Sequence, residues 1–331
     1  MEKVYLPATV RPRGDLRLPG TFLQRVRRST AVLWPRMLNL SCAALRPQAP
    51  LTVEARALAA YLGLAVGDAL GATVEFLTPK EIQQQIGVHR NLTGGGWLKL
   101  RPGVVTDDTT MSLALGDAIL ACQGRVEPLA AAQAFDRWMR GKPVDIGNTV
   151  RRNLVRFRQT GEPHALPSEH DAGNGAAMRL LPVALATLGQ DADAVRAAVH
   201  AQAHVTHHNI LSDAACETLV AMVHDLLAGA EKKTVLQRHV QPLVQQYPLF
   251  GFRRRRCDNP SGYIVDTLQA VFQAFFDTDG LEDCLIDVVN RGGDADTTGA
   301  IAGMLAGAHY GPKALPRRWL AVLDAKTRAA C

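Results

Sequence analysis

The chain has 331 residues, of which 47% are hydrophobic and 21% charged, and its formal net charge is +6. This composition excludes disordered, collagen-like and coiled-coil chains and is typical of a globular protein with one large domain or two smaller ones. The charge does not indicate nucleic-acid binding. Residues 1–50 contain nine Lys/Arg and two acids, whereas the rest has 28 bases and 29 acids, and binding to phosphates needs a basic stripe on a folded surface.

Residues 1–52 form a basic, Pro- and Arg-rich segment without a sustained apolar period. We expect an N-terminal extension that is disordered or a start-site artefact, with Met37 as another possible start. A transit peptide and a partner-binding arm are the alternatives. No run approaches the ~20 apolar residues of a membrane-spanning helix, so no transmembrane segment is expected. The six cysteines include no Cys-x-x-Cys pair, which favours reduced thiols in the cytoplasm.

From residue 53 onward apolar residues recur at helical spacing, and alternating strand-like runs are almost absent. The predicted helices are 53–71, 109–121, 128–140, 150–159, 175–188, 192–203, 212–228, 233–247, 264–276, 281–290, 298–310 and 317–327. With no composition break to mark a second domain, the prediction is an all-α, single-domain helical bundle over residues 53–331.

Two of these helices carry glycine every fourth residue, at positions 63, 67 and 71 and at positions 299, 303 and 307. Each glycine inside a helix costs ~1 kcal/mol relative to alanine. A close approach of the two helices would offset this cost, so we expect them to cross near the centre of the bundle.

Acidic residues gather before two predicted helices, in Thr106-Asp107-Asp108-Thr109 and in Asp294-Ala295-Asp296-Thr297. Helix N-caps are the simple explanation, but a cap uses one carboxylate and each segment supplies two. Together with Glu75, which follows the first glycine helix, these acids would repel one another without a counter-charge. Hard divalent cations prefer such oxygen ligands, so the sequence favours a metal centre, with two metals one plausible arrangement.

Polar loops complete the pattern. Asp145 and Asn148 flank a glycine, Gly173-Asn174-Gly175 opens a helix and can receive phosphate or ribose oxygens, and Thr206-His207-His208-Asn209 precedes another helix. Gly94-Gly95-Gly96-Trp97 could act as a lid. An ordinary turn or packing loop remains the alternative for each.

Several strings, in order from about residue 55 to about residue 325, resemble the ADP-ribosylglycohydrolase family. They are Gly63-x-x-x-Gly67-Asp68-Ala69-x-Gly71-x-x-x-Glu75, Thr106-Asp107-Asp108-Thr109, Gly173-Asn174-Gly175-Ala176-x-Met178-Arg179 and Gly292-Gly293-Asp294-Ala295-Asp296-Thr297. Residues 71–76, 94–98, 143–149 and 263–267 are most similar to the branch that acts on nitrogenase.

This resemblance implies an all-helical hydrolase with two divalent cations, Mn²⁺ or Mg²⁺, that removes ADP-ribose from a modified arginine of the nitrogenase iron protein. The implied metal ligands are Thr106, Asp107, Asp108, Asp294, Asp296 and Thr297. The implied substrate-binding residues are Asn148, Gly173, Asn174, Gly175, His207 and Tyr263. Glu75 and Asp145 are the candidates for proton transfer in attack by an activated water.

The alternatives are hydrolysis of ADP-ribosylserine or O-acetyl-ADP-ribose, and a non-catalytic metal-binding relative. The resemblance further implies a PII signalling protein as partner and recruitment to the membrane through an ammonium channel, so that a cytoplasmic protein would become peripheral to the membrane when sequestered. Close relatives read Thr-His-Asn where this chain has Thr206-His207-His208-Asn209, which leaves the roles of His208 and Asn209 open.

Overall fold

The structure is a computed structural model that describes residues 51–331, so the prediction for residues 1–50 falls outside the described part. The described residues form helices and no strands, which confirms the all-α prediction. The helices are α1 (Val53–Gly71), α2 (Pro79–Gln85), α3 (Asp107–Ala121), α4 (Pro128–Arg140), α5 (Asn148–Thr160), α6 (Leu181–Ala186), α7 (Ala192–Ala203), α8 (Ile210–Leu227), α9 (Lys232–Val235), α10 (Gln241–Gln246), α11 (Ile264–Asp277), α12 (Leu281–Val289), α13 (Ala295–Tyr310), α14 (Arg317–Val322) and α15 (Ala325–Ala330). None of them is long and apolar enough to cross a membrane.

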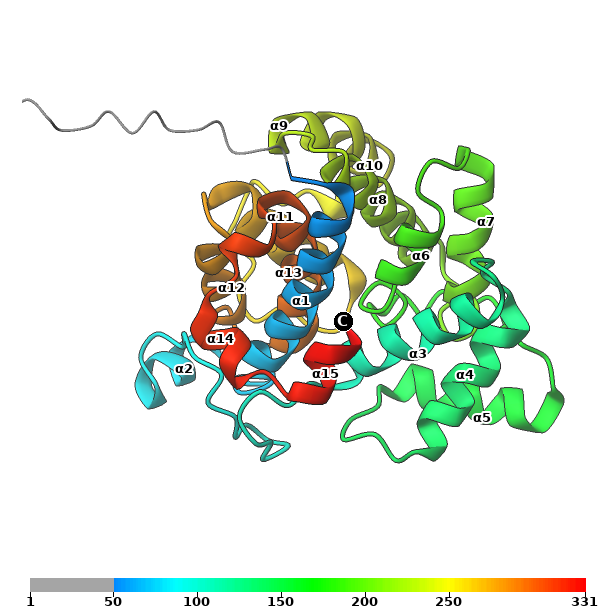
Figure 1. Ribbon diagram of the computed structural model, residues 1–331, viewed down its shortest axis with the longest axis horizontal. Helices are drawn as coiled ribbons and strands as arrows, with labels where there is room; N and C mark the ends of the chain where they lie inside the picture. The colour runs from blue at the N-terminus through cyan, green and yellow to red at the C-terminus, as the bar shows by residue number, and fades with distance from the viewer. Residues whose placement is uncertain (1–50) are drawn as a thin grey trace, which may run out of the picture. The chain divides into compact units, whose positions relative to one another are not determined.

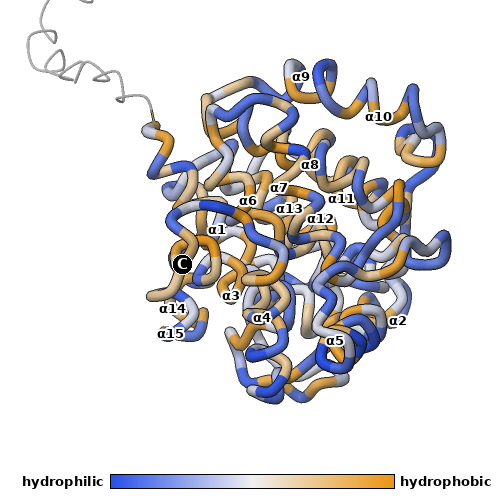
Figure 2. The backbone as a smooth tube through the Cα atoms, turned by 90° about the vertical axis from the view of Figure 1, so that its right-hand side faces the viewer, coloured by the Kyte–Doolittle hydropathy of each residue, from blue (hydrophilic) through white to orange (hydrophobic). Residues whose placement is uncertain are grey.

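Helices α1 and α13 come from opposite ends of the described sequence but lie side by side in the fold, with other helices around them (Figure 1). Nearly all residues of α13 are buried. The outer helices are amphipathic instead. Helix α5 exposes several arginines while burying Val150 and Leu154, and its tube is largely hydrophilic in Figure 2.

The α1–α13 contact is backbone against backbone, as the two glycine faces predict. A Cβ atom on Gly67 would overlap the carbonyl oxygen of Gly299, and one on Gly63 would overlap that of Gly303. Gly71 in turn lies against the Ala295 carbonyl. The end of α1 therefore meets the start of α13, and this brings the segment after α1 close to Asp294 and Asp296.

Several helix bounds differ from the prediction. Helix α2 was not predicted, although Thr78 and Glu81 form a capping box at its start. Helices α3 and α13 begin two and three residues earlier than predicted, which places Asp107, Asp108 and Asp296 in first turns.

The predicted helix 175–188 is wrong over its first part, because only Leu181–Ala186 is helical. Helices α9 and α10 are joined by a π-helical turn, Leu236–Val240, where the N–H of Gln241 bonds to the Leu236 carbonyl. Pro242 has no N–H to continue the regular pattern. The predicted helix 317–327 is divided between α14 and α15 at two extended residues, Leu323 and Asp324.

The glycine contact predicts the effect of adding one methyl group. Gly67→Ala should lower the free energy of unfolding by about 1–3 kcal/mol or more, because the methyl group has no space against the Gly299 carbonyl. Gly116→Ala is the matched control, because its Cβ would make an ordinary contact, 3.4 Å from the Tyr61 hydroxyl. This variant should be more stable than the wild type by about 0.5–1 kcal/mol, because alanine favours the helix. Urea unfolding of both variants measures the difference, and equal stability would contradict the close approach.

Candidate metal centre and substrate cleft

A cleft of about 660 Å³ opens where α1 ends and where α3, α5 and α13 begin. Of the predicted site residues, those lining it are Glu75, Asp107, Asp145, Asn148, Gly173, Asn174, Gly175, His207, Asp294 and Thr297. Thr106, Asp108 and Asp296 do not line it but are buried. The structure thus brings together side chains that are more than 200 residues apart in sequence.

The carboxylates converge at one end of this cleft. Oxygen atoms of Glu75, Asp294 and Asp296 all lie within 4.8 Å of one another. Asp108 joins them through the Thr297 hydroxyl, which is 3.5 Å from its Oδ2 atom. Neither Thr106 nor Asp294, which occupy the N-cap positions of α3 and α13, makes a side-chain capping bond. Helix capping therefore does not explain these acidic residues.

The start of α3 is held by a carboxylate that sequence reasoning did not select for the site. Asp68, fully buried in α1, accepts hydrogen bonds from the backbone N–H and hydroxyl groups of both Thr106 and Thr109. These bonds fix the segment that presents Asp107 and Asp108. Asp68 occurs in the family-like string around Gly67, which was the only signal for it.

Burial raises the pKa of these acids, and their neighbours' charges add to the effect. The pKa of Asp107 rises to about 7 and that of Glu75 to about 8. Burial also raises the pKa of Asp108 and Asp296 well above the usual range. Ionising such a group without a cation is unfavourable, so the cluster favours either protons or bound metal.

The donor set suits hard divalent cations. Asp108 Oδ2 accepts a hydrogen bond from the Thr106 hydroxyl, whereas Asp108 Oδ1 is buried without a hydrogen-bond partner among the described residues. A buried carboxylate oxygen without a donor is costly. Oxygen ligands from carboxylates and threonine hydroxyls match Mg²⁺ or Mn²⁺, and no Cys or His belongs to this cluster.

Glu75 is also held from the rim of the cleft. The indole N–H of Trp97 donates a 2.6 Å hydrogen bond to Glu75 Oε2, and the Trp97 ring lies 5.4 Å from the ring of Phe76. Both aromatic side chains are exposed and line the cleft. The sequence indicated a lid at residues 94–97 but not this bond to a carboxylate.

The His207 ring packs against the glycine loop, next to Gly173 and Gly175. A Cβ on Gly175 would be 2.7 Å from the His207 ring, so only glycine fits there. Arg179 donates to the Thr206 hydroxyl, which also forms a 2.8 Å hydrogen bond with His207 Nδ1. Burial, together with the charges of Arg179 and Arg152, lowers the pKa of His207 to about 3. His207 is therefore neutral, and its Nε2 atom faces the glycine loop.

The remaining predicted residues lie around the same cleft. Asp145 and Asn148 belong to the wall at the start of α5, where the Gly147 N–H lies 3.4 Å from Asp107 Oδ2. Asn174 donates to Asp294 Oδ2 at 2.6 Å and so links the glycine loop to the carboxylates. Tyr263 does not line the cleft; its backbone pairs with that of Gly173.

The structure also gives His208 and Asn209 roles. His208 Nδ1 bonds to the Ala165 carbonyl, and Asn209 donates to the Ser168 carbonyl while capping α8. Both residues fasten the turn between α7 and α8 to the segment 165–168, and neither lines the cleft.

Comparisons with known proteins agree with this geometry. The ADP-ribosylglycohydrolase profile matches residues 49–330. The chain is 54% identical over 275 residues to the ADP-ribosyl-[dinitrogen reductase] glycohydrolase of Rhodospirillum rubrum, covering 83% of this chain and 92% of that protein. It is 34% identical to the ADP-ribosylarginine hydrolase Tri1 of Pseudomonas putida, covering 86% and 78%.

A solved structure described as an ADP-ribosylglycohydrolase-related protein complex superposes with a TM-score of 0.74 at 36% identity, covering 84% of this chain and 96% of that one. The fold, the profile match and the relatives agree with the motifs that converge on the cleft. The chain belongs to the ADP-ribosylglycohydrolase family.

Proposed function

We propose that this chain hydrolyses the bond between ADP-ribose and an arginine side chain of nitrogenase reductase and so restores the activity of that enzyme. The observation that carries the proposal is the convergence of Glu75, Asp294 and Asp296 at a cleft that the Gly173–Gly175 loop also lines. The relative from Rhodospirillum rubrum, named for action on dinitrogen reductase, supports this substrate, and Tri1 supports the arginine linkage. We assign the activity to a domain spanning residues 53–331.

Two divalent cations fit the carboxylate end, with Mn²⁺ favoured and Mg²⁺ the alternative. Thr106, Asp107, Asp108, Asp294, Asp296 and Thr297 would hold them, and the unpartnered Asp108 oxygen supports this assignment. When bound, such cations would orient ribose hydroxyls and acidify the attacking water.

Other side chains and the glycine loop would bind the substrate. Asn148, Gly173, Gly175 and the His207 ring would bind the ADP-ribose, with Asn174 orienting Asp294. Tyr263 would position Gly173 through its backbone.

Glu75 and Asp145 are the candidates for moving the proton, because both carboxylates line the cleft. Trp97 holds Glu75 beside the cation ligands, whereas Asp145 lies on the α5 wall. A carboxylate near the anomeric carbon would also stabilise the positive charge that develops on the sugar in the transition state.

A cytoplasmic location, a PII signalling partner and membrane recruitment through an ammonium channel remain predictions from the family resemblance. They concern how the hydrolase would be regulated, and the chemistry proposed for the cleft does not depend on them.

The substrate assignment is tested by incubating the full chain with ADP-ribosylated nitrogenase reductase, an ADP-ribosylserine peptide and O-acetyl-ADP-ribose, each with Mn²⁺ or with EDTA. We expect ADP-ribose release from the arginine conjugate in Mn²⁺ only. Release from the serine peptide or the acetyl ester, but not from arginine, would overturn the assignment. No release from any conjugate would favour a non-catalytic relative.

Two carboxylate variants should separate metal binding from proton transfer. Asp296→Asn should abolish tight Mn²⁺ binding and turnover, because it removes a buried anion beside Glu75 and Asp294. Asp145→Asn should bind Mn²⁺ nearly as the wild type does and lose about 10²–10⁴-fold in turnover. Calorimetry and a release assay measure both effects, and normal turnover by Asp296→Asn would exclude it as a ligand.

The raised pKa values predict how pH affects the stability of the metal-free protein. Asp107 and Glu75 have folded pKa values of about 7 and about 8, against reference values of 3.8 and 4.5. At pH values between the reference pKa and the folded pKa, the folded chain binds more protons than the unfolded chain. The free energy of unfolding therefore falls as pH rises through this range. Mg²⁺ replaces those protons, and the rise in Tm that saturating Mg²⁺ produces should grow from pH 5.5 to pH 8. A Tm shift independent of pH would contradict the assignment of these carboxylates to the metal centre.

A further inference from the structure

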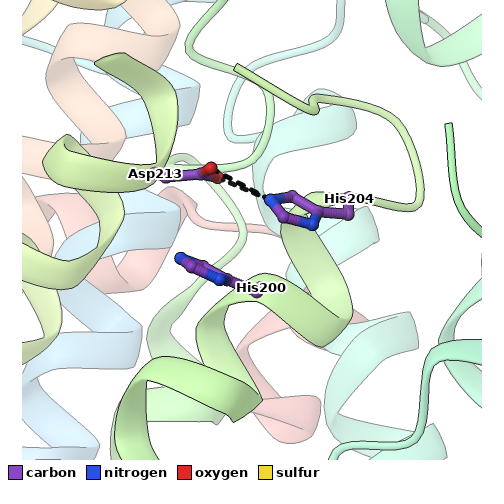
Figure 3. Close-up of side chains that lie close together, drawn as sticks. All are labelled: His200, His204 and Asp213. Atoms are coloured by element: carbon purple, nitrogen blue, oxygen red, sulfur yellow. Dashed lines mark hydrogen bonds and ion pairs between the residues drawn. The ribbon is translucent and has the colours of Figure 1, made fainter. Parts of the chain in front are cut away.

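A second group of metal-ligand side chains flanks the turn between α7 and α8. His200 and His204 are four residues apart at the end of α7, and Asp213 and Glu217 are four apart in α8. Residues at this spacing share one helix face. The two pairs face each other, because His200 bonds to Glu217 and His204 bonds to Asp213. Figure 3 shows the His204 ring directed at Asp213, with His200 beside them.

The distances suit one small cation. His204 Nε2 is 3.0 Å from each carboxylate oxygen of Asp213, and His200 Nε2 is 2.8 Å from Glu217 Oε1. One donor atom each of His200, His204 and Asp213 lies within 4.8 Å of the others. Ligands of a tetrahedral Zn²⁺ stand ~3.3 Å apart, since each bond is ~2.0–2.1 Å long, so small side-chain rotations would complete the site.

The ligand chemistry differs from that of the cleft. Imidazole nitrogen with carboxylate oxygen suits zinc and related transition metals, whereas the cleft cluster offers oxygen only. The two carboxylates balance a charge of +2. Arg196 lies 3.6 Å from Glu217 Oε2 and competes for that carboxylate. Asp213 is therefore the main anionic ligand, and Glu217 or water takes the fourth position.

The cluster can be reached from solvent. The side chain of His200 is 32% exposed, and those of His204 and Asp213 are 15% and 16% exposed. A separate cleft of about 510 Å³ is bordered by His200, Asp213 and Glu217 and gives an entry path. The site is thus sheltered enough to hold a metal and open enough to receive one.

We propose that His200, His204 and Asp213 bind one transition-metal ion of the Zn²⁺ type and thereby join α7 to α8. The ion would fix the intervening turn, residues 204–209, whose His207 lines the substrate cleft. The His208 ring stacks on His204 with centroids 3.8 Å apart, so the turn also contacts a proposed ligand directly. The role is structural, and the proposal does not rest on the proposed hydrolysis.

Zinc binding to the full chain tests this proposal, with saturating Mg²⁺ present to occupy the cleft. Equilibrium dialysis should find one more Zn²⁺ per chain in the wild type than in His204→Gln, or a binding constant weakened more than about tenfold, because even groups that only orient a ligand are worth ~10–100-fold. His239→Gln is the matched control, because His239 pairs with Asp225 at 2.9 Å but is outside the cluster. It should bind zinc as the wild type does.

Equal zinc stoichiometry and affinity in the wild type and His204→Gln would overturn the proposal. The cluster would then be two histidine–carboxylate hydrogen bonds that join α7 to α8 without a metal. Asp213→Asn provides a second test if His204→Gln does not fold. Co²⁺ should give the wild type the strong visible absorption of a tetrahedral site, and Asp213→Asn should lose that absorption. Its persistence in Asp213→Asn would also overturn the proposal.

Discussion

The whole arrangement depends on the direct contact between the backbones of α1 and α13. Glycine on both helix faces removes the side chains that would keep the axes apart, and the carbonyl of each helix fills the space where a Cβ of the other would lie. The carboxylate cluster follows from this contact, because Glu75 is four residues beyond Gly71 and Asp296 lies in the first turn of α13. A metal centre built from both ends of the described chain needs such a fixed junction.

A second constraint brings Asp107 and Asp108 to that junction. The carboxyl group of Asp68 is fully buried in α1, yet four donors from Thr106 and Thr109 satisfy it. A buried carboxylate with this many donors is specific for one arrangement, because any shift of α3 would leave it unpaired. The same core thus positions both Asp107 and Asp108.

Sequence could predict what depends on local periodicity and on strings of ligand-type residues. The helix 53–71, the meeting of the glycine faces and the convergence of Glu75 with Asp294 all follow from such signals. Long-range hydrogen bonds were not predictable. Asp68 meets its partners 38 and 41 residues away, and Trp97 reaches Glu75 across 22 residues. The false helix start at residue 175 has the same origin, because the Asn174 N–H bonds to the distant Gly262 carbonyl.

The hydrogen bond between Trp97 and Glu75 places a fluorescent side chain at the cleft. Indole emission responds to the charge and polarity around its N–H, and this N–H contacts a carboxylate at the metal end of the cleft. Among the tryptophans of residues 51–331, Trp319 is buried and Trp138 bonds to the Thr110 hydroxyl, and neither lines the cleft. Within residues 51–331, Trp97 is therefore the tryptophan whose emission would respond to cations or nucleotide bound in the cleft.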